Sequence, residues 1–286
     1  MGARVSQILA EDGAVRGVRL ENGGTCMADA VVLATGGMSY PGTGSTGDGY
    51  RLAERLGHTV VSPRAALVPI EASEKWCAEL MGLSLKNVTL TLKNAAGKAV
   101  FSEMGEMLFT HFGVSGPLVL SASSYIKEDP GAYRIEIDLK PALNMQQLDA
   151  RLLRDFAENR NRDFINALDR LLPRKLIPVA VRLSGVAPEK KVHSITQAER
   201  RAFAALLKAL PVTPKAFAPI EQAVITSGGI SAREINPKSM ESKLIRGLYP
   251  IGEVVDVDAF TGGFNLQIAF STAFLAAAAI AAADNG

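Results

Sequence analysis

The residues best suited to chemistry lie near the C-terminal end of the sequence, between positions 247 and 267. A short apolar stretch predicts a strand that ends at Gly252 and Glu253, and a carboxylate at a strand end suits a sugar or polyol hydroxyl. A glycine-bearing loop then precedes a long apolar helix, whose first N–H groups stabilise an anion or an electron-rich carbonyl by about 0.3–1 kcal/mol. A flavin offers both partners, in its ribityl chain and its N1–C2=O edge. A buried strand, loop and helix without a ligand is the alternative interpretation.

The whole string at residues 252–267 resembles a known family. It reads Gly-Glu-Val-x-Asp-Val-Asp and ends in Gly-Gly-Phe-Asn-Leu-Gln, and it is similar to the BaiN-like flavoproteins, also named aminoacetone oxidase-type NAD(P)/FAD-dependent oxidoreductases. Further strings similar to that family are Ala34–Gly37 with Thr46–Gly49, Gly105–Pro117, and Glu234–Lys243. The resemblance covers nearly the whole chain. It implies an FAD-dependent oxidoreductase that transfers hydride through the flavin, with NAD(P)H as a candidate electron donor.

The resemblance also implies roles for individual residues. Glu253 accepts a hydrogen bond from a ribityl hydroxyl, and the amides around residues 265–267 stabilise anionic reduced flavin. Residues 34–37 pass beside the cofactor, where glycine lets the backbone approach a bulky ligand. The predicted cofactor-binding residues are Ala34, Thr35, Gly36, Gly37, Asp48, Gly252, Glu253, Gly263, Asn265, Leu266 and Gln267. No residue stands out as a catalytic acid or base, and the substrate is predicted only to be a small organic molecule.

Some of these positions have structural alternatives. Asp48 opens a helix predicted over residues 48–56, so its carboxylate could equally be the N-cap or a first-turn acid. The segment from Gly105 to Pro117 predicts a loop into a helix that begins near the proline. In that loop His111 or Ser115 could contact the flavin, or the loop could be a structural connector.

A literal Gly-x-Gly-x-x-Gly string at residues 42–47 is a rival nucleotide site. A strand precedes it and a helix follows, which suits the dinucleotide fingerprint of a pyridine-nucleotide dehydrogenase. However, several residues including Tyr40 and Pro41 separate the strand from the first glycine. The acidic residue expected about 20 positions later at a strand end is also missing. We therefore predict that this string does not wrap a pyrophosphate.

The pattern of elements predicts an α/β fold with an α+β insert. Asp12-Gly13 and Asn22-Gly23 separate three short strands, over residues 4–10, 14–20 and 27–34, which we expect to form an antiparallel meander. After residue 217 the flavin-type strings resume, beginning with a strand at 222–226 that leads into a glycine turn. We predict that residues 1–61 and 218–286 form one discontinuous FAD-binding domain of the two-dinucleotide type.

Residues 62–217 are predicted to form an inserted substrate domain of strands followed by a helical group. Alternating apolar residues indicate strands over 85–92 and 133–139. Residues 144–210 have helical spacing, with Asn144 as an N-cap and a capping box that begins at Thr196.

One part of the family pattern is absent from the sequence. Family members begin with a strand–Gly-x-Gly-x-x-Gly–helix unit that holds the FAD pyrophosphate, and this chain starts after that unit. We therefore expect an N-terminally truncated version of a longer protein, which binds FAD weakly or not at all where an upstream-extended version binds it tightly. A non-catalytic, partner-binding remnant of the fold is a third hypothesis, beside the flavoenzyme and the dehydrogenase.

The composition argues against several other classes. With 31 basic and 29 acidic residues, the charge points to neither nucleic acid nor a membrane surface. Cys26 and Cys77 form no Cys-x-x-Cys pair and the three histidines have no ligand spacing, so we predict a reducing cytoplasm and no metal site. The apolar run over 268–283 is short for a membrane span and predicts a helix packed in a core. No oligomeric state is predicted.

Overall fold

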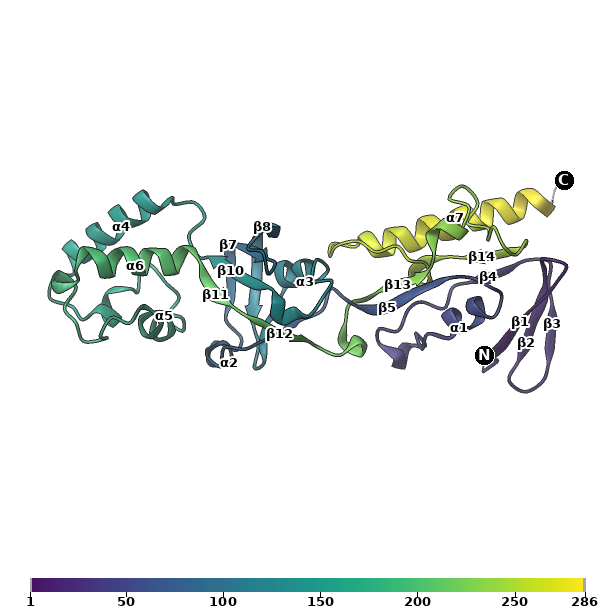
Figure 1. The fold of residues 1–286 in the computed structure, drawn as a ribbon, viewed down its shortest axis with the longest axis horizontal. Helices are drawn as coiled ribbons and strands as arrows, with labels where there is room; N and C mark the ends of the chain where they lie inside the picture. Colours follow the sequence, from purple (N-terminus) through teal and green to yellow (C-terminus); the bar gives the residue numbers. More distant parts are fainter. Residues whose placement is uncertain (1, 285–286) are drawn as a thin grey trace. The chain divides into compact units, whose positions relative to one another are not determined.

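The first sheet is an antiparallel meander, shown with the rest of the fold in Figure 1. In the computed structural model, which describes residues 2–284, the sheet order is β1 (Val5–Glu11), β2 (Ala14–Leu20) and β3 (Thr25–Met27). Asp12 and Gly13 both have positive φ, as a tight hairpin turn requires. The predicted meander is confirmed. The predicted third strand over 27–34 is wrong, because β3 ends at Met27 and the chain then enters a different sheet.

That second sheet is a parallel pair built from distant parts of the chain. β4 (Val31–Leu33) lies beside β14 (Leu248–Pro250). Glu253 does not end the strand as predicted, because Gly252–Val254 form a single 3₁₀ turn (η7) just beyond it. The carboxylate is therefore held on a turn, at the carboxyl end of a parallel strand.

A third pair joins β5 (Val60–Ala66) to β13 (Ile225–Ile230) in antiparallel register. The expected strand over 222–226 with a glycine turn after it is corrected, because Gly228 and Gly229 lie inside β13. A Cβ on Gly228 would lie 2.6 Å from the Ser62 carbonyl oxygen, so a bulged strand passing close to β5 needs glycine there. The helix α1 (Asp48–Glu54) packs against both strands of this pair.

Contacts divide the chain into two units, residues 2–68 with 219–284 and residues 69–218. β5 crosses the predicted domain boundary at residues 61/62. The core of the first unit brings together Leu33, Tyr50, Leu248 and Val254, which come from both segments. The two segments therefore share one core.

The second unit contains a seven-stranded sheet in which every neighbouring pair is antiparallel. Its order is β11 (Leu210–Val212), β10 (Arg134–Asp138), β7 (Ser84–Lys93), β8 (Ala99–Phe109), β9 (Gly113–Ser115), β6 (Ile70–Ala72) and β12 (Pro214–Phe217). Short helices α2 (Trp76–Glu79) and α3 (Pro117–Ser123) accompany it. The helix predicted at Pro117 is confirmed, but the predicted loop before it is largely strands β8 and β9.

A helical group completes the second unit: α4 (Met145–Glu158), α5 (Ile177–Ser184) and α6 (Gln197–Lys208). Asn144 and Thr196 each form the predicted capping box with the residue three positions later. Phe164 packs edge-on against Phe156 and Phe203, and one apolar cluster joins these rings to the sheet. The remaining 3₁₀ turns are η1 (Pro41–Thr43), η2 (Pro130–Ala132), η3 (Phe164–Ala167), η4 (Val192–Ser194), η5 (Ile220–Gln222) and η6 (Ala232–Glu234).

The last helix, α7 (Phe264–Asp284), corrects the prediction of a helix packed in a core. Its residues 264–283 are long and apolar enough to cross a membrane, yet only 6% of its most apolar window is buried. Ala276 is buried and Leu275 and Ile280 pack against the core, so one face is covered. The sequence pattern could not show this, since residues on both faces are apolar.

Candidate functional site

Glu253 is positioned by the backbone of β13. The Thr226 N–H donates to Glu253 Oε1 over 2.7 Å, which fixes one carboxylate oxygen. The Thr226 hydroxyl in turn accepts from the N–H groups of Met38 and Ser39, over 2.7 and 3.1 Å. These bonds join the carboxylate, the start of β13 and the loop after β4 into one hydrogen-bonded assembly. The other Glu253 oxygen takes part in no described hydrogen bond, so it is available to a ligand hydroxyl.

Gly37 lies against this assembly so closely that no side chain fits. An added Cβ would lie 2.4 Å from Thr226 Oγ1 and 2.6 Å from Glu253 Oε1. The glycine predicted from the Ala-Thr-Gly-Gly string is therefore required by close approach of the backbone to the carboxylate.

A cavity of about 400 Å³ opens beside Glu253, within the first unit. This volume is in the range of small-molecule sites. Its walls are mostly apolar, with Glu253 as the one ionisable side chain. The lining residues are Leu67, Val224, Ile225, Thr226, Glu253, Val257, Phe260, Thr261, Gly262, Gly263, Asn265, Leu266, Ile268 and Ala269.

The N-terminus of α7 supplies the polar end of the cavity. The Asn265 side chain pairs with the Ala259 backbone through two 2.8 Å hydrogen bonds, which closes the loop before the helix. The first intrahelical bond runs from the Gln267 N–H to the Gly263 carbonyl. The N–H groups of residues 264–266 have no described partner, as expected at a helix start. They can serve as donors to an anion or a carbonyl.

Two buried hydroxyls of the same unit lack partners among the described residues. They are Thr35 Oγ1 and Tyr50 Oη. Burial, followed by the nearby charge of Glu253, raises the pKa of Tyr50 to about 12. Tyr50 is therefore a neutral phenol at physiological pH. Unpaired buried polar atoms are uncommon in proteins and are often accounted for by an absent ligand or water.

The predicted cofactor residues fall into three sets. Glu253, Gly263, Asn265 and Leu266 line the cavity, and Gly37 touches Glu253 from outside it. Gly252 stands beside Glu253 and donates its N–H to Thr272 Oγ1 over 3.0 Å. The structure does not bring the others to the lining: Ala34, Thr35 and Gly36 lie on the loop after β4, Gln267 bonds Ser271, and Asp48 lies elsewhere.

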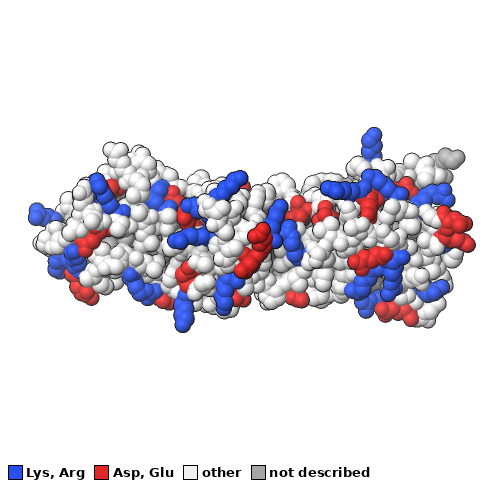
Figure 2. Space-filling view, in the orientation of Figure 1, with Lys and Arg blue, Asp and Glu red and all other residues white. Residues whose placement is uncertain are grey.

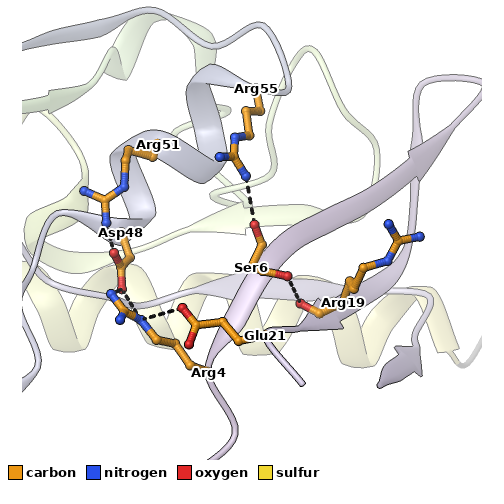
Figure 3. Close-up of polar contacts among 7 residues, drawn as sticks. All are labelled: Arg4, Ser6, Arg19, Glu21, Asp48, Arg51 and Arg55. Carbon is orange, nitrogen blue, oxygen red and sulfur yellow. Dashed lines mark hydrogen bonds and ion pairs between the residues drawn. The ribbon is translucent and has the colours of Figure 1, made fainter. Parts of the chain in front are cut away.

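Asp48 belongs to an ionic cluster between α1 and β1 (Figure 3). Its carboxylate pairs with Arg4 over 2.8 Å and with Arg51, and Arg4 also approaches Glu21. The N-cap of α1 is Gly47, so Asp48 is a first-turn acid, one of its two predicted structural roles. Both oxygens of the Asp48 carboxylate are therefore bound by arginines of the same unit.

The sequence reasoning missed Thr226 and the apolar walls. Thr226 precedes the Ser-Gly-Gly string, but nothing in the sequence links it to a residue 27 positions away. It also left the 234–243 string unexplained. There, Ser242 Oγ and Glu234 Oε2 lie 2.9 and 3.0 Å from the two nitrogens of the buried His58. These contacts join the string to the segment between α1 and β5.

The rival string at residues 42–47 lacks the geometry of a dinucleotide fingerprint. β4 ends at Leu33 and α1 begins at Asp48, with the 3₁₀ turn η1 between them. The fingerprint needs a strand that turns directly into a helix. His111 and Ser115 lie in the second unit, and their predicted contact with a flavin stays a prediction. Among residues 2–284 no cluster of three or more His, Cys, Asp or Glu side chains could hold a metal.

Comparison with known proteins places the chain in a family. Residues 64–225, more than half of it, match the family described as HI0933-like protein barrel and H2TH domain. The chain belongs to the HI0933-like family. It is 33% identical to a ribosomal RNA dihydrouridine synthase of Haemophilus influenzae. The similar region covers 97% of this chain and 67% of that protein.

Two further curated relatives are similar over most of the chain. It is 34% identical to the ribosomal RNA dihydrouridine synthase of Escherichia coli, covering 92% of this chain and 64% of that protein. It is 30% identical to the 3-dehydro-bile acid delta(4,6)-reductase of Clostridium scindens. The similar region covers 89% of this chain and 62% of that protein. This HI0933-like chain thus spans about two thirds of the length of the relatives it matches, all of which carry enzyme names.

Proposed function

We propose that this HI0933-like chain is the flavin-holding part of an FAD-dependent oxidoreductase. The observation that carries the proposal is the apolar cavity with one fixed carboxylate, Glu253, beside the free N–H groups that open α7. An isoalloxazine ring needs apolar walls, a polyol acceptor and a donor near its N1–C2=O edge. The chain offers all three within one unit. The closer assignment to the BaiN-like flavoproteins is part of this proposal.

The protein residues would act mainly by binding and orientation. Glu253 would accept from a ribityl hydroxyl, with the Thr226 N–H holding the carboxylate in place. The N–H groups of residues 264–266 would donate to the pyrimidine edge and favour negative charge there. Gly37 would keep the backbone close to the carboxylate. Bound FAD, reduced by NAD(P)H, would supply the hydride.

The names of the relatives suggest a shared reaction class. Dihydrouridine is uridine with its C5–C6 double bond reduced, and that bond is conjugated to a carbonyl. A 3-oxo steroid with 4,6 double bonds is likewise a conjugated enone. We propose that this chain contributes to the same chemistry, the addition of a hydride and a proton, the latter from water, across a C=C bond conjugated to a carbonyl. A cytoplasmic location agrees with that use of reduced cofactors.

Two alternatives remain to be separated by experiment. A pyridine-nucleotide dehydrogenase would use residues 42–47, and a non-catalytic remnant would hold no cofactor. Titration of the chain with FAD, followed by flavin fluorescence, tests both. We expect saturable binding, with the weak affinity predicted from the sequence. Fluorescence unchanged at saturating FAD would overturn the proposal.

A pair of glycine variants makes that titration specific. In Gly37→Ala the new methyl group would collide with Glu253 and Thr226, so FAD affinity should fall by about tenfold or more, given the ~1.5–3 kcal/mol value of a hydrogen bond to a charged group. In Gly42→Ala the methyl group meets nothing within 4 Å, so FAD affinity should be unchanged. A larger loss of FAD affinity in Gly42→Ala than in Gly37→Ala would contradict the proposed flavin site at Glu253. Circular dichroism would check that both variants are folded.

A further inference from the structure

The second unit has a cavity of its own, of about 510 Å³. This volume is in the range of small-molecule sites, and all of its lining residues belong to the second unit. The walls come from three segments: the start of α2 with the residues before it, the turn between β8 and β9, and β12. The polar and aromatic lining consists of Ser73, Glu74, Lys75, His111, Phe112 and Lys215.

Three nitrogen-bearing side chains at this cavity have their donors free. Lys75, His111 and Lys215 are exposed, and none has an ion pair or side-chain hydrogen bond among the described residues. The one carboxylate of the lining, Glu74, accepts the Thr213 N–H through its two oxygens, over 3.1 and 2.9 Å. Two lysines against one glutamate leave the lining a net charge of +1 when the histidine is neutral. A cavity with this excess of positive charge attracts an anion.

Backbone hydrogen bonds join the three segments that form the walls. The Ser73 N–H donates to the Thr213 carbonyl over 2.9 Å, and the Ala72 N–H donates to the Phe112 carbonyl over 3.0 Å. The first bond, with the Glu74 carboxylate, links the residues before α2 to the start of β12. The second bond links them to the turn between β8 and β9. The free donors therefore project from one hydrogen-bonded framework.

The turn between β8 and β9 presents His111. Thr110 Oγ1 accepts the Gly113 N–H over 3.0 Å, and the Thr110 N–H donates to the Gly113 carbonyl over 2.9 Å. The His111 ring packs edge-on against Phe112, with ring centroids 4.9 Å apart. A Cβ on Gly113 would lie 2.3 Å from a backbone oxygen of β6, so this turn needs glycine at its end. The string at residues 105–117, which the proposed function does not use, thus places an imidazole at the cavity.

Lys215 lies at a β-bulge. Across the pair of β6 and β12, Pro214 lies opposite Ala72. Ala216 lies opposite Glu71, the adjacent residue of β6, so Lys215 is an extra residue of β12 without an opposite partner. Bulges redirect side chains and are common beside functional sites. Here the residue at the bulge is a lysine that lines the cavity.

The charge pattern favours a small anion over a polyanion. Lys and Arg are interspersed with Asp and Glu over the face shown in Figure 2, and a polyanion needs an extended basic track. Three donors around one cavity of small-molecule size suit a single oxyanion instead. Lysine binds an oxyanion as a point charge. The imidazole of His111 and the hydroxyl of Ser73 can each add a directed hydrogen bond.

We propose that this cavity binds the oxyanion group of a small organic molecule, a carboxylate or a phosphate monoester. Lys75, His111 and Lys215 donate to its oxygens, and the ring of Phe112 is the apolar wall for its organic part. The proposal goes beyond the flavin-binding function and needs no flavin, because the whole lining belongs to the second unit. It gives His111 a role within its own unit.

Histidine NMR of the full chain, without FAD, tests this proposal directly. The chain has three histidines, His58, His111 and His193, so the ring signal of His111 can be assigned with a single His111→Gln variant. The chain would be titrated with benzoate and with phenyl phosphate, and with benzamide as the neutral analogue of benzoate. The buried His58, and His193, which contacts the Arg160 carbonyl over 2.7 Å, lie outside the cavity and serve as internal references.

We expect at least one of the two anions to shift the His111 signal saturably, with a dissociation constant of about 1 mM or below. The reference signals should stay unchanged. Benzamide should bind about tenfold or more weakly than benzoate or phenyl phosphate, whichever binds better, because it lacks the charge. The order of the two anions identifies which oxyanion the cavity takes.

Two double variants locate the binding. Lys75→Gln with Lys215→Gln should weaken it about tenfold or more, since both charged donors are lost. Lys98→Gln with Lys127→Gln removes the same charge from exposed positions of this unit outside the cavity, and should stay within about threefold because salt screens distant charges. Thermal unfolding would check that both fold.

Three results would overturn the proposal. They are the absence of a His111 shift with either anion, benzamide binding as tightly as the anions, and an equal loss of affinity in the two double variants. Because no flavin is present in the titration, failure of the chain to bind FAD would leave this result untouched.

Discussion

The phenol hydroxyl of Tyr50 is buried and has no described hydrogen-bond partner. It lies close enough to Glu253 for the negative charge of that carboxylate to raise its pKa. Burying a hydroxyl without a hydrogen bond costs roughly 1–3 kcal/mol. Burial and the Glu253 charge together raise the pKa of Tyr50 to about 12 from an ordinary value of 10.0. The folded chain therefore holds the proton more tightly than the unfolded chain does.

This shift predicts the effect of Tyr50→Phe on stability. Between about pH 10 and pH 12 the unfolded chain releases the Tyr50 proton and the folded chain keeps it, so the free energy of unfolding falls as pH rises. Tyr50→Phe should remove this part of the alkaline loss. At neutral pH it should leave stability equal or higher by about 1 kcal/mol, because no hydrogen bond is lost.

Urea unfolding of Tyr50→Phe at several alkaline pH values would measure both effects, with Tyr40→Phe as a control at an exposed position. A loss of more than about 1 kcal/mol at neutral pH would mean that the Tyr50 hydroxyl has a partner in solution.

Among the elements, α6 shows how a capping-box sequence stabilises the N-terminus of a helix. Thr196 Oγ1 accepts from the Glu199 N–H, and Glu199 Oε2 accepts from the Thr196 N–H over 2.8 Å. Lys190 binds the same carboxylate and, with these bonds, lowers the pKa of Glu199 to about 2. The stability that this carboxylate contributes is present above its ordinary pKa of 4.5 and is lost as the pH falls toward 2.

Thr196→Ala should therefore destabilise the second unit by about 1 kcal/mol at neutral pH, the usual cost of losing an N-cap. Thr196→Ser keeps the hydroxyl and should cost much less. Chemical denaturation followed by circular dichroism would compare the two. Equal loss for both would show that the threonine methyl group, and not the cap, is what matters.

Local signals such as these were readable from the sequence, and the distant contacts were not. Asp12-Gly13, Asn144 and Thr196 act within a few residues, and each formed the predicted turn or cap. The division of residues 27–34 between two sheets depends on β14, over 200 residues later, which no local pattern encodes. For the same reason Glu253 was found as a candidate but its partner Thr226 was not.

At the scale of the whole molecule, α7 leaves an unusual face exposed. Leu266, Phe270 and Phe274 follow one another at four-residue spacing and are 64%, 68% and 73% exposed. Exposed apolar patches of this kind promote association.

We therefore predict that the chain self-associates, and that the double variant Phe270→Ser with Phe274→Ser does so less, with little change in unfolding. Leu275→Ser, which alters the face packed on the core, should instead destabilise the fold. Light scattering and urea unfolding would measure the two properties. A double variant as unstable as Leu275→Ser would show that the phenylalanines are packed in solution.

The pairing of β4 with β14 has a consequence for how the chain is made. The second unit is continuous in sequence, so every strand of its sheet is available once residue 218 has been made. Leu33, by contrast, pairs with Pro250, so its strand must wait for more than 200 further residues. At synthesis rates of about 5–20 residues per second this wait lasts roughly 10–40 s. During that interval β4 lacks the strand with which it pairs, so the core residue Leu33 that it carries is without its partners from the C-terminal segment.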